Sequence, residues 1–127
     1  MTGVQTCALP ICQIQGGVAQ GIGTALYEEM PYDEQAQPLG STLSDYLLPG
    51  PTEVPDVRIF HMLTPSPYTR FGQKGLGEGG AIAPPAAITN AINDAVKGLG
   101  AELLVSPITP RRIVEAIEAA AEREPTA

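Results

Sequence analysis

A single carboxylate set among glycines is the part of this sequence best suited to chemistry. Glu78 lies in the stretch QKGLGEGGAIAPP, and five glycines lie around it: Gly72, Gly75, Gly77, Gly79 and Gly80. Glycines free the backbone to turn and leave amides uncovered, so this loop can hold an anion or let a bulky cofactor lie against the chain. The alternative is an exposed loop glutamate without a role. A Walker-type phosphate loop is excluded, because Gly-Lys-Ser/Thr does not follow at the required spacing.

A second group of glycines lies near the beginning, in QIQGGVAQGIGTALYEE. Val18, Ile22 and Leu26 recur every four positions, which predicts a helix from Gly16 to Glu29 with one apolar face. Each glycine costs up to about 1 kcal/mol of helix propensity relative to alanine. We therefore expect another helix or a ligand to lie close to this backbone.

The spacing Gly17-x-x-x-Gly21-x-Gly23 also matches some dinucleotide-binding turns. Such turns work directly after a buried strand, where the helix amino terminus faces a pyrophosphate. The preceding residues Gln13-Ile14-Gln15 do not read as a buried strand. Close helix packing is therefore the favoured interpretation, and nucleotide binding of this kind is disfavoured.

Both glycine groups need elements to position them, and the sequence predicts an α+β arrangement of helices packed with short strands and a glycine-rich active-site loop. Residues 30–56 are rich in Pro, Gly, Asp and Ser and predict turns. Residues 57–63 alternate as a strand and include the only histidine, His61, which has no partners typical of a metal site. Residues 103–105 predict a second short strand.

Two further helices are expected after the Glu78 loop. Pro84-Pro85 suits a helix start, Ile88, Ile92 and Val96 give its apolar face, and Gly98 or Gly100 can close it. Thr109 and Pro110 predict the start of the last helix. Its inner and outer residues are expected to be Ile113, Val114 and Ile117 inside, and Arg111, Arg112, Glu115 and Glu118 outside.

Composition excludes several classes of function. The 127 residues carry 14 acidic and 7 basic side chains, a net charge of -7, and no basic cluster larger than Arg111-Arg112. Nucleic acids and anionic membrane surfaces are therefore not expected partners, and no apolar run approaches the roughly 20 residues of a spanning helix. The two cysteines, Cys7 and Cys12, support neither a disulfide framework nor a metal site. A soluble, cytoplasmic protein without protein ligands to a metal is expected.

The first eleven residues, MTGVQTCALPI, lack the charged start and cleavage site of a secretory signal. They resemble the translation of a short-read sequencing adapter, and a glycine codon split at the junction would place Cys12 where the native chain has glycine. We therefore expect three parts: an adapter-derived segment 1–11, a fragment of one domain in 12–121, and a frayed tail 122–127.

The sequence resembles the carboxyl-terminal end of the large, molybdopterin-binding subunit of the xanthine dehydrogenase and aldehyde oxidase family, near the carbon-monoxide-dehydrogenase-like members. The resemblance covers about positions 12–120 and rests on four stretches in the family's order: QIQGGVAQGIGTALYEE, SDYLLP, QKGLGEGGAIAPPAAITNAINDA and SPITPRRI. The KGLGEGG motif is specific, and the glycine helix is moderately so. The family's first motif begins with Gly-Gln, which agrees with a glycine at position 12.

The resemblance implies hydroxylation of a carbon centre, with water as the source of oxygen. Glu78 matches the family's general base, which takes a proton from a molybdenum-bound hydroxyl. Lys74, Gly75, Leu76 and Gly77 match the stretch that borders the pterin, and Gln13 matches a glutamine that hydrogen-bonds the cofactor.

The resemblance also implies molybdopterin with molybdenum, in the cytosine dinucleotide form expected of a bacterial protein, and partner subunits that carry iron-sulfur clusters and FAD. The family's subunit is several times longer, so a missing amino-terminal part is expected, and the fragment alone is expected to be inactive. The substrate, an aldehyde, a heteroaromatic or a related small molecule, stays open. The alternatives are a small module that binds an anion or nucleotide through its glycine loops, and an accessory protein that packs its alanine-rich helices on a partner.

Overall fold

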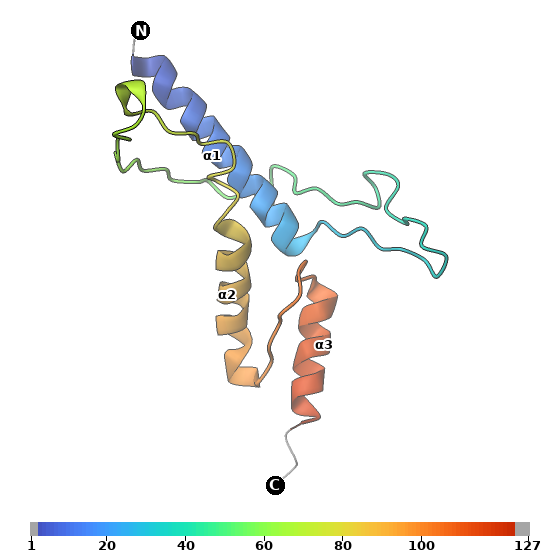
Figure 1. The fold of residues 1–127 in the computed structure, drawn as a ribbon. Helices are drawn as coiled ribbons and strands as arrows, with labels where there is room; N and C mark the ends of the chain where they lie inside the picture. Colours follow the sequence, from blue (N-terminus) through green and yellow to red (C-terminus); the bar gives the residue numbers. More distant parts are fainter. Residues whose placement is uncertain (1–2, 124–127) are drawn as a thin grey trace.

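The computed structural model describes residues 3–123, and its regular structure is helical (Figure 1). The elements are α1 (Gly3–Leu26), the 3-10 turn η1 (Arg70–Gly72), α2 (Pro84–Val96), the 3-10 turn η2 (Lys97–Leu99) and α3 (Pro110–Ala121). One long segment, residues 27–83, connects α1 to α2 and forms an irregular loop on each side of α1. Helices α2 and α3 lie side by side near the carboxyl end of α1. Residues 124–127 of the expected frayed tail lie outside the described part.

The short strands of the predicted α+β fold are not confirmed in this part of the chain. Within residues 3–123 no strand forms, and the one isolated β-bridge joins Tyr32 to Pro38. The predicted strand 57–63 is irregular, and its side chains Phe60, Met62 and Leu63 are each 88% exposed. A strand exists only with a hydrogen-bonded neighbour. The side chains of residues 57–63 alternate as in a strand, but no described segment forms backbone hydrogen bonds beside them.

The second predicted strand, 103–105, is replaced by a side-chain contact. Asn93 of α2 donates from Nδ2 to the carbonyl oxygen of Leu103 (2.9 Å) and accepts at Oδ1 from the Leu103 amide (2.8 Å). The amide group of asparagine has the same donor and acceptor as a peptide unit. Asn93 therefore occupies both backbone groups of Leu103 in the way that a neighbouring strand would.

The apolar core lies between the end of α2, the segment 101–108 and α3. Its buried side chains are Val96, Ala101, Leu103, Ile108 and Ala120, with Ile92, Ile113, Ala116 and Ile117 packed against them. Val114 was expected inside but is 54% exposed, because it lies on the other side of α3 from this cluster. The start of α2 thus packs against α1 at Gly21, and its end joins α3 in this core.

The helix ends follow local chemistry, and both ends of α1 differ from the predicted range of Gly16 to Glu29. Thr109 caps α3 by accepting from the Arg112 amide, and Gly100 closes η2 with φ 70° and a bond from its amide to the Lys97 carbonyl. Helix α1 begins before Gly16 and ends at Leu26, because the Gly23 carbonyl accepts from the amides of residues 27 and 28 and stops the α-helical pattern.

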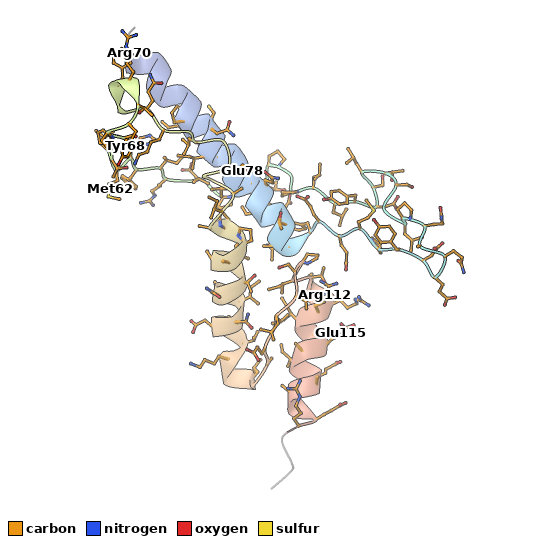
Figure 2. The ribbon with its side chains drawn as sticks, viewed as in Figure 1. Met62, Tyr68, Arg70, Glu78, Arg112 and Glu115 are labelled. Carbon is orange, nitrogen blue, oxygen red and sulfur yellow. The ribbon has the colours of Figure 1, made fainter. Side chains whose placement is uncertain are left out.

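An ion pair joins the segment just after α1 to the first turn of α3. Arg112 was expected to face solvent, but its Nη2 donates to Oε1 of Glu29 at 2.5 Å, and its Nη1 donates to the Pro107 carbonyl at 2.7 Å. Nearby, the Ile108 amide donates to the Ala25 carbonyl at 2.6 Å. The carboxyl end of α1 is thereby attached to the start of α3 (Figure 2).

In the acidic loop 27–56, Tyr46 joins the middle of the loop to its own start, two residues after α1 ends. Its hydroxyl donates to Oε2 of Glu28 at 2.5 Å, and this bond to a carboxylate raises the pKa of Tyr46 above its ordinary value. At the far part of the loop, the Thr52 hydroxyl and the Gly50 amide both donate to Glu53 and lower the pKa of its carboxyl group. Charge-assisted hydrogen bonds therefore order a loop that has no regular structure.

Asn93→Leu should destabilise the chain, because the amide and carbonyl of the buried Leu103 lose their partners. The expected loss of unfolding free energy is about 1–3 kcal/mol, measured by urea denaturation. Asn90→Ala is the matched control, since Asn90 lies on the exposed side of α2, and it should change stability by less than about 0.5 kcal/mol. Equal effects of the two variants would contradict the role given to Asn93.

Titration of Tyr46 should release the acidic loop at high pH. The pKa of Tyr46 is raised in the folded chain, so the stabilisation is complete below the unfolded value of about 10 and is lost as the pH rises through the folded value. The ultraviolet titration of the chain minus that of Tyr46→Phe should show a tyrosine that ionises later than free tyrosine. A difference curve centred on the free value would refute the contact.

Candidate functional site

The Glu78 loop lies against the middle of α1, where Gly80 meets Ile14 and Ala81 meets Gly17 (Figure 2). The Glu78 side chain is exposed, and none of the side-chain hydrogen bonds found within residues 3–123 uses its carboxylate. Its backbone is ordered by a turn in which the Glu78 carbonyl accepts from the Ala81 amide at 2.9 Å. The carboxylate is therefore held on a fixed main chain and faces outward from it.

Gln13 contacts this loop immediately before Glu78. Its Nε2 donates to the Gly77 carbonyl at 2.6 Å, across 64 residues of sequence. Around this bond lies an open cavity of about 270 Å³, lined by Pro10, Gln13, Leu76 and Gly77. Three of the residues assigned to cofactor binding by resemblance therefore line one cavity beside Glu78. Pro10 belongs to residues 1–11, whose foreign origin stays a prediction.

Beyond Glu78 the two backbones are almost in contact. A β-carbon added to Gly17 would lie 2.8 Å from the Ala81 nitrogen and from the carbonyl carbon and Cα of Gly80. A β-carbon on Gly80 would lie 2.5 Å from the Ile14 carbonyl oxygen and 2.9 Å from its Cα. Separations below 3.0 Å are sterically forbidden, so both positions require glycine at this crossing.

The next glycine of α1 has a different neighbour. A β-carbon on Gly21 would lie 2.7 Å from Cβ of Pro84 and 3.1 Å from Cδ of Pro85, at the first turn of α2. Gly17 and Gly21 thus lie mid-helix against the chain itself, rather than at a helix start that faces a pyrophosphate. This arrangement agrees with the interpretation of close packing and does not fit a dinucleotide-binding turn.

The remaining assigned residues form the outer part of the loop. Lys74 donates from Nζ to the Thr64 hydroxyl at 2.9 Å, away from the cavity. A β-carbon on Gly75 or Gly77 would have nothing within 4 Å, and neither residue has the positive φ that favours glycine. Nothing in the described chain therefore requires glycine at these two positions.

Sequence reasoning missed the residues that hold the loop in place. Gly80 was noted only as one of the flexible loop glycines, Ile14 was given no role, and a close neighbour was expected for the helix that contains Gly17 without being identified. A signal was present, since a helix with four glycines needs a close neighbour. Its partner could not be identified, because 63 positions separate Gly17 from Gly80.

Other features of the described surface do not point to a second site. A second hollow, about 500 Å³, is open, is lined by the polar end of α2, Lys97 and residues 100–102, and does not include Glu78. Residues 3–123 contain no cluster of His, Cys, Asp and Glu that could hold a metal ion. None of the three α-helices in this range is long and apolar enough to span a membrane.

In chemical terms the site combines one free carboxylate, a primary amide and a cavity bordered by bare backbone. A carboxylate can accept a proton, and the amide can donate and accept hydrogen bonds. The cavity lacks phosphate-binding features of the Walker type. The arrangement suits a reaction in which a bound group lies against residues 75–77 while Glu78 accepts a proton.

The chain is similar in sequence to known molybdopterin-binding proteins. Residues 7–55 match the family model of the molybdopterin cofactor-binding domain. The nicotine 6-hydroxylase large subunit of Paenarthrobacter nicotinovorans is 43% identical over 82% of this chain and 13% of its own length. The xanthine dehydrogenase molybdenum-binding subunit of Escherichia coli O157:H7 is 35% identical over 81% of this chain and 13% of its own length.

The fold agrees with these matches. The crystal structure of quinoline 2-oxidoreductase from Pseudomonas putida 86 superimposes with a TM-score of 0.81 at 48% identity, over 84% of this chain and 14% of that one. The chain therefore spans about one seventh of the length of these relatives. By sequence and by structure, the chain belongs to the xanthine dehydrogenase and aldehyde oxidase family of molybdopterin-binding large subunits.

Proposed function

We propose that this chain forms the base-bearing part of the active site in a molybdenum hydroxylase large subunit, with Glu78 as the general base. The observation that carries the proposal is the meeting of Gln13 and Gly77 beside Glu78, since it joins two distant motifs at one cavity. Family membership supports a molybdenum-dependent oxidoreductase. The reaction proposed is hydroxylation of an electrophilic carbon with water as the oxygen source.

The outer loop fits a large, flat cofactor. The β-carbon positions of Gly75 and Gly77 open onto free space, and their φ values do not require glycine. A bulky group that lies against this backbone would explain both glycines, because any side chain would hold it away. Gly75, Leu76 and Gly77 are therefore proposed to border the molybdopterin. The bound cofactor would supply the water-derived oxygen and accept the two electrons of the oxidation.

Glu78 is the residue of this chain that can accept the proton. Its side chain is exposed, and Glu78 is the residue that follows the cavity-lining Gly77. A hydroxyl group is a weak nucleophile until a base removes its proton. If the rest of the subunit covers this side, partial loss of water will raise the pKa of the carboxyl group toward the working pH.

Gln13 has two proposed tasks. One Nε2 hydrogen is used by the Gly77 carbonyl, and a primary amide keeps a second hydrogen and an acceptor oxygen. Those remaining groups would orient the cofactor. Lys74 is proposed to act at the border of the site by holding Thr64, since its ammonium group donates to the Thr64 hydroxyl and Lys74 does not line the cavity.

The substrate proposed is a small aldehyde or heteroaromatic compound. The printed names of the relatives support this class, since one acts on nicotine and one solved neighbour on quinoline. The cytosine dinucleotide form of the pterin, the iron-sulfur and FAD partner subunits and a cytoplasmic location are proposals that follow from the resemblance. The chain alone is proposed to have no turnover, because it spans about one seventh of such a subunit.

Glu78→Gln should remove the base while preserving side-chain volume. The test uses the nicotine 6-hydroxylase large subunit with residues 12–123 of this chain in place of its matching segment. Turnover should fall by about 10²-fold or more, while the molybdenum and pterin content stays unchanged. Glu118→Gln, on the exposed side of α3, is the matched control and should keep normal turnover. Near-normal turnover of the Glu78 variant with full cofactor would refute the base assignment.

A further inference from the structure

Glu78 lies between two attachments of its loop to α1. On one side, Gln13 Nε2 holds the Gly77 carbonyl at 2.6 Å. On the other side, the Gly80–Ala81 backbone lies against Ile14 and Gly17. The two attachments are three to four residues apart, so the main chain between them has little freedom. The position of the carboxylate depends on both.

We propose that Gly17 is a positioning residue for Glu78: its lack of a side chain lets the loop seat on α1 and sets the place of the carboxylate. Gly17 does not touch the cavity and acts through Gly80 and Ala81. The inference rests on the proposed function of Glu78. Gly17 lies 61 positions from Glu78 in the sequence and has no side-chain group that could take part in the chemistry.

The steric consequence of a substitution at Gly17 is well defined. The atoms that an alanine β-carbon would meet at 2.8 Å are all backbone atoms, so no flexible side chain can move aside. The loop must instead move away from the helix. Because Ala81 donates its amide to the Glu78 carbonyl at 2.9 Å, displacement of Ala81 carries Glu78 with it.

The chain offers two matched controls on the same helix. A β-carbon on Gly16 would meet nothing within 4 Å, so Gly16→Ala adds the same methyl group and the same helix propensity without a clash. Gly21→Ala adds a clash of similar size, 2.7 Å from Cβ of Pro84, at the start of α2 rather than at the Glu78 loop. Gly16→Ala controls for the added methyl group and helix propensity, and Gly21→Ala controls for a steric clash elsewhere on α1.

The first experiment uses the 127-residue chain and needs no activity. Amide hydrogen exchange should accelerate at Ala81 in Gly17→Ala by about tenfold or more, because the Ala81 amide is the donor of the turn that must open. Gly16→Ala should leave this amide unchanged, and Gly21→Ala should instead accelerate Ala87 and Ile88, the first hydrogen-bonded amides after the two prolines of α2. Unchanged exchange at Ala81 in Gly17→Ala, or the same change in all three variants, would overturn the inference.

The second experiment is a double-mutant cycle in the chimeric large subunit described above. Gly17→Ala should lower kcat by roughly 10- to 10²-fold through misplacement of the base, with KM and molybdenum content near normal. In the Glu78→Gln background, Gly17→Ala should lower kcat by less than about twofold, because the base is already lost. Gly21→Ala should keep kcat near normal.

The outcomes separate the two proposals. If Glu78→Gln has no effect, the function proposed for Glu78 is wrong, whatever Gly17 does. If Glu78→Gln lowers kcat but Gly17→Ala lowers it equally in both backgrounds, Gly17 has only a structural role and this inference fails. If Gly17→Ala prevents accumulation of the chimera, the exchange measurement on the 127-residue chain decides the inference alone.

Discussion

The Gly80–Ala81 backbone lies against α1 so closely that neither Gly17 nor Gly80 can carry a β-carbon. This crossing brings the end of the Glu78 loop onto the helix, and the first turn of α2 follows three residues later against Gly21. Two backbones can approach in this way only where both lack side chains. The placement of α2, and through its core contacts that of α3, therefore depends on the same few glycines as the placement of the candidate base.

Parts of this arrangement were predictable from local chemistry. The starts of α2 and α3 follow from Pro84 and from Thr109-Pro110, and the closing Gly100 has the positive φ for which glycine is suited. The motif residues around Glu78 were identifiable because short motifs are local in sequence. Each of these features depends on neighbours within a few positions, which a single sequence displays directly.

Features that depend on distant partners were not predictable. The alternation in 57–63 indicated a strand, but a strand is a property of two segments, and no described segment pairs with it. The partner of Gly17 and the ion pair between Arg112 and Glu29 join residues more than 60 positions apart. In the site itself, the hydrogen bond from Gln13 to Gly77 was missed for the same reason, although both residues had been assigned to the cofactor by resemblance.

Asn93 has a consequence that concerns other molecules rather than this fold. The segment around Leu103 is extended, and the neighbouring side chains of Leu104 and Val105 are 80% and 65% exposed. Exposed apolar segments with open backbone groups are templates on which other chains add as strands and aggregate. The Asn93 side chain occupies the amide and the carbonyl of Leu103, so another chain cannot form hydrogen bonds with these two groups. One asparagine thus removes the two backbone groups of Leu103 from those that a second chain could use to add as a strand.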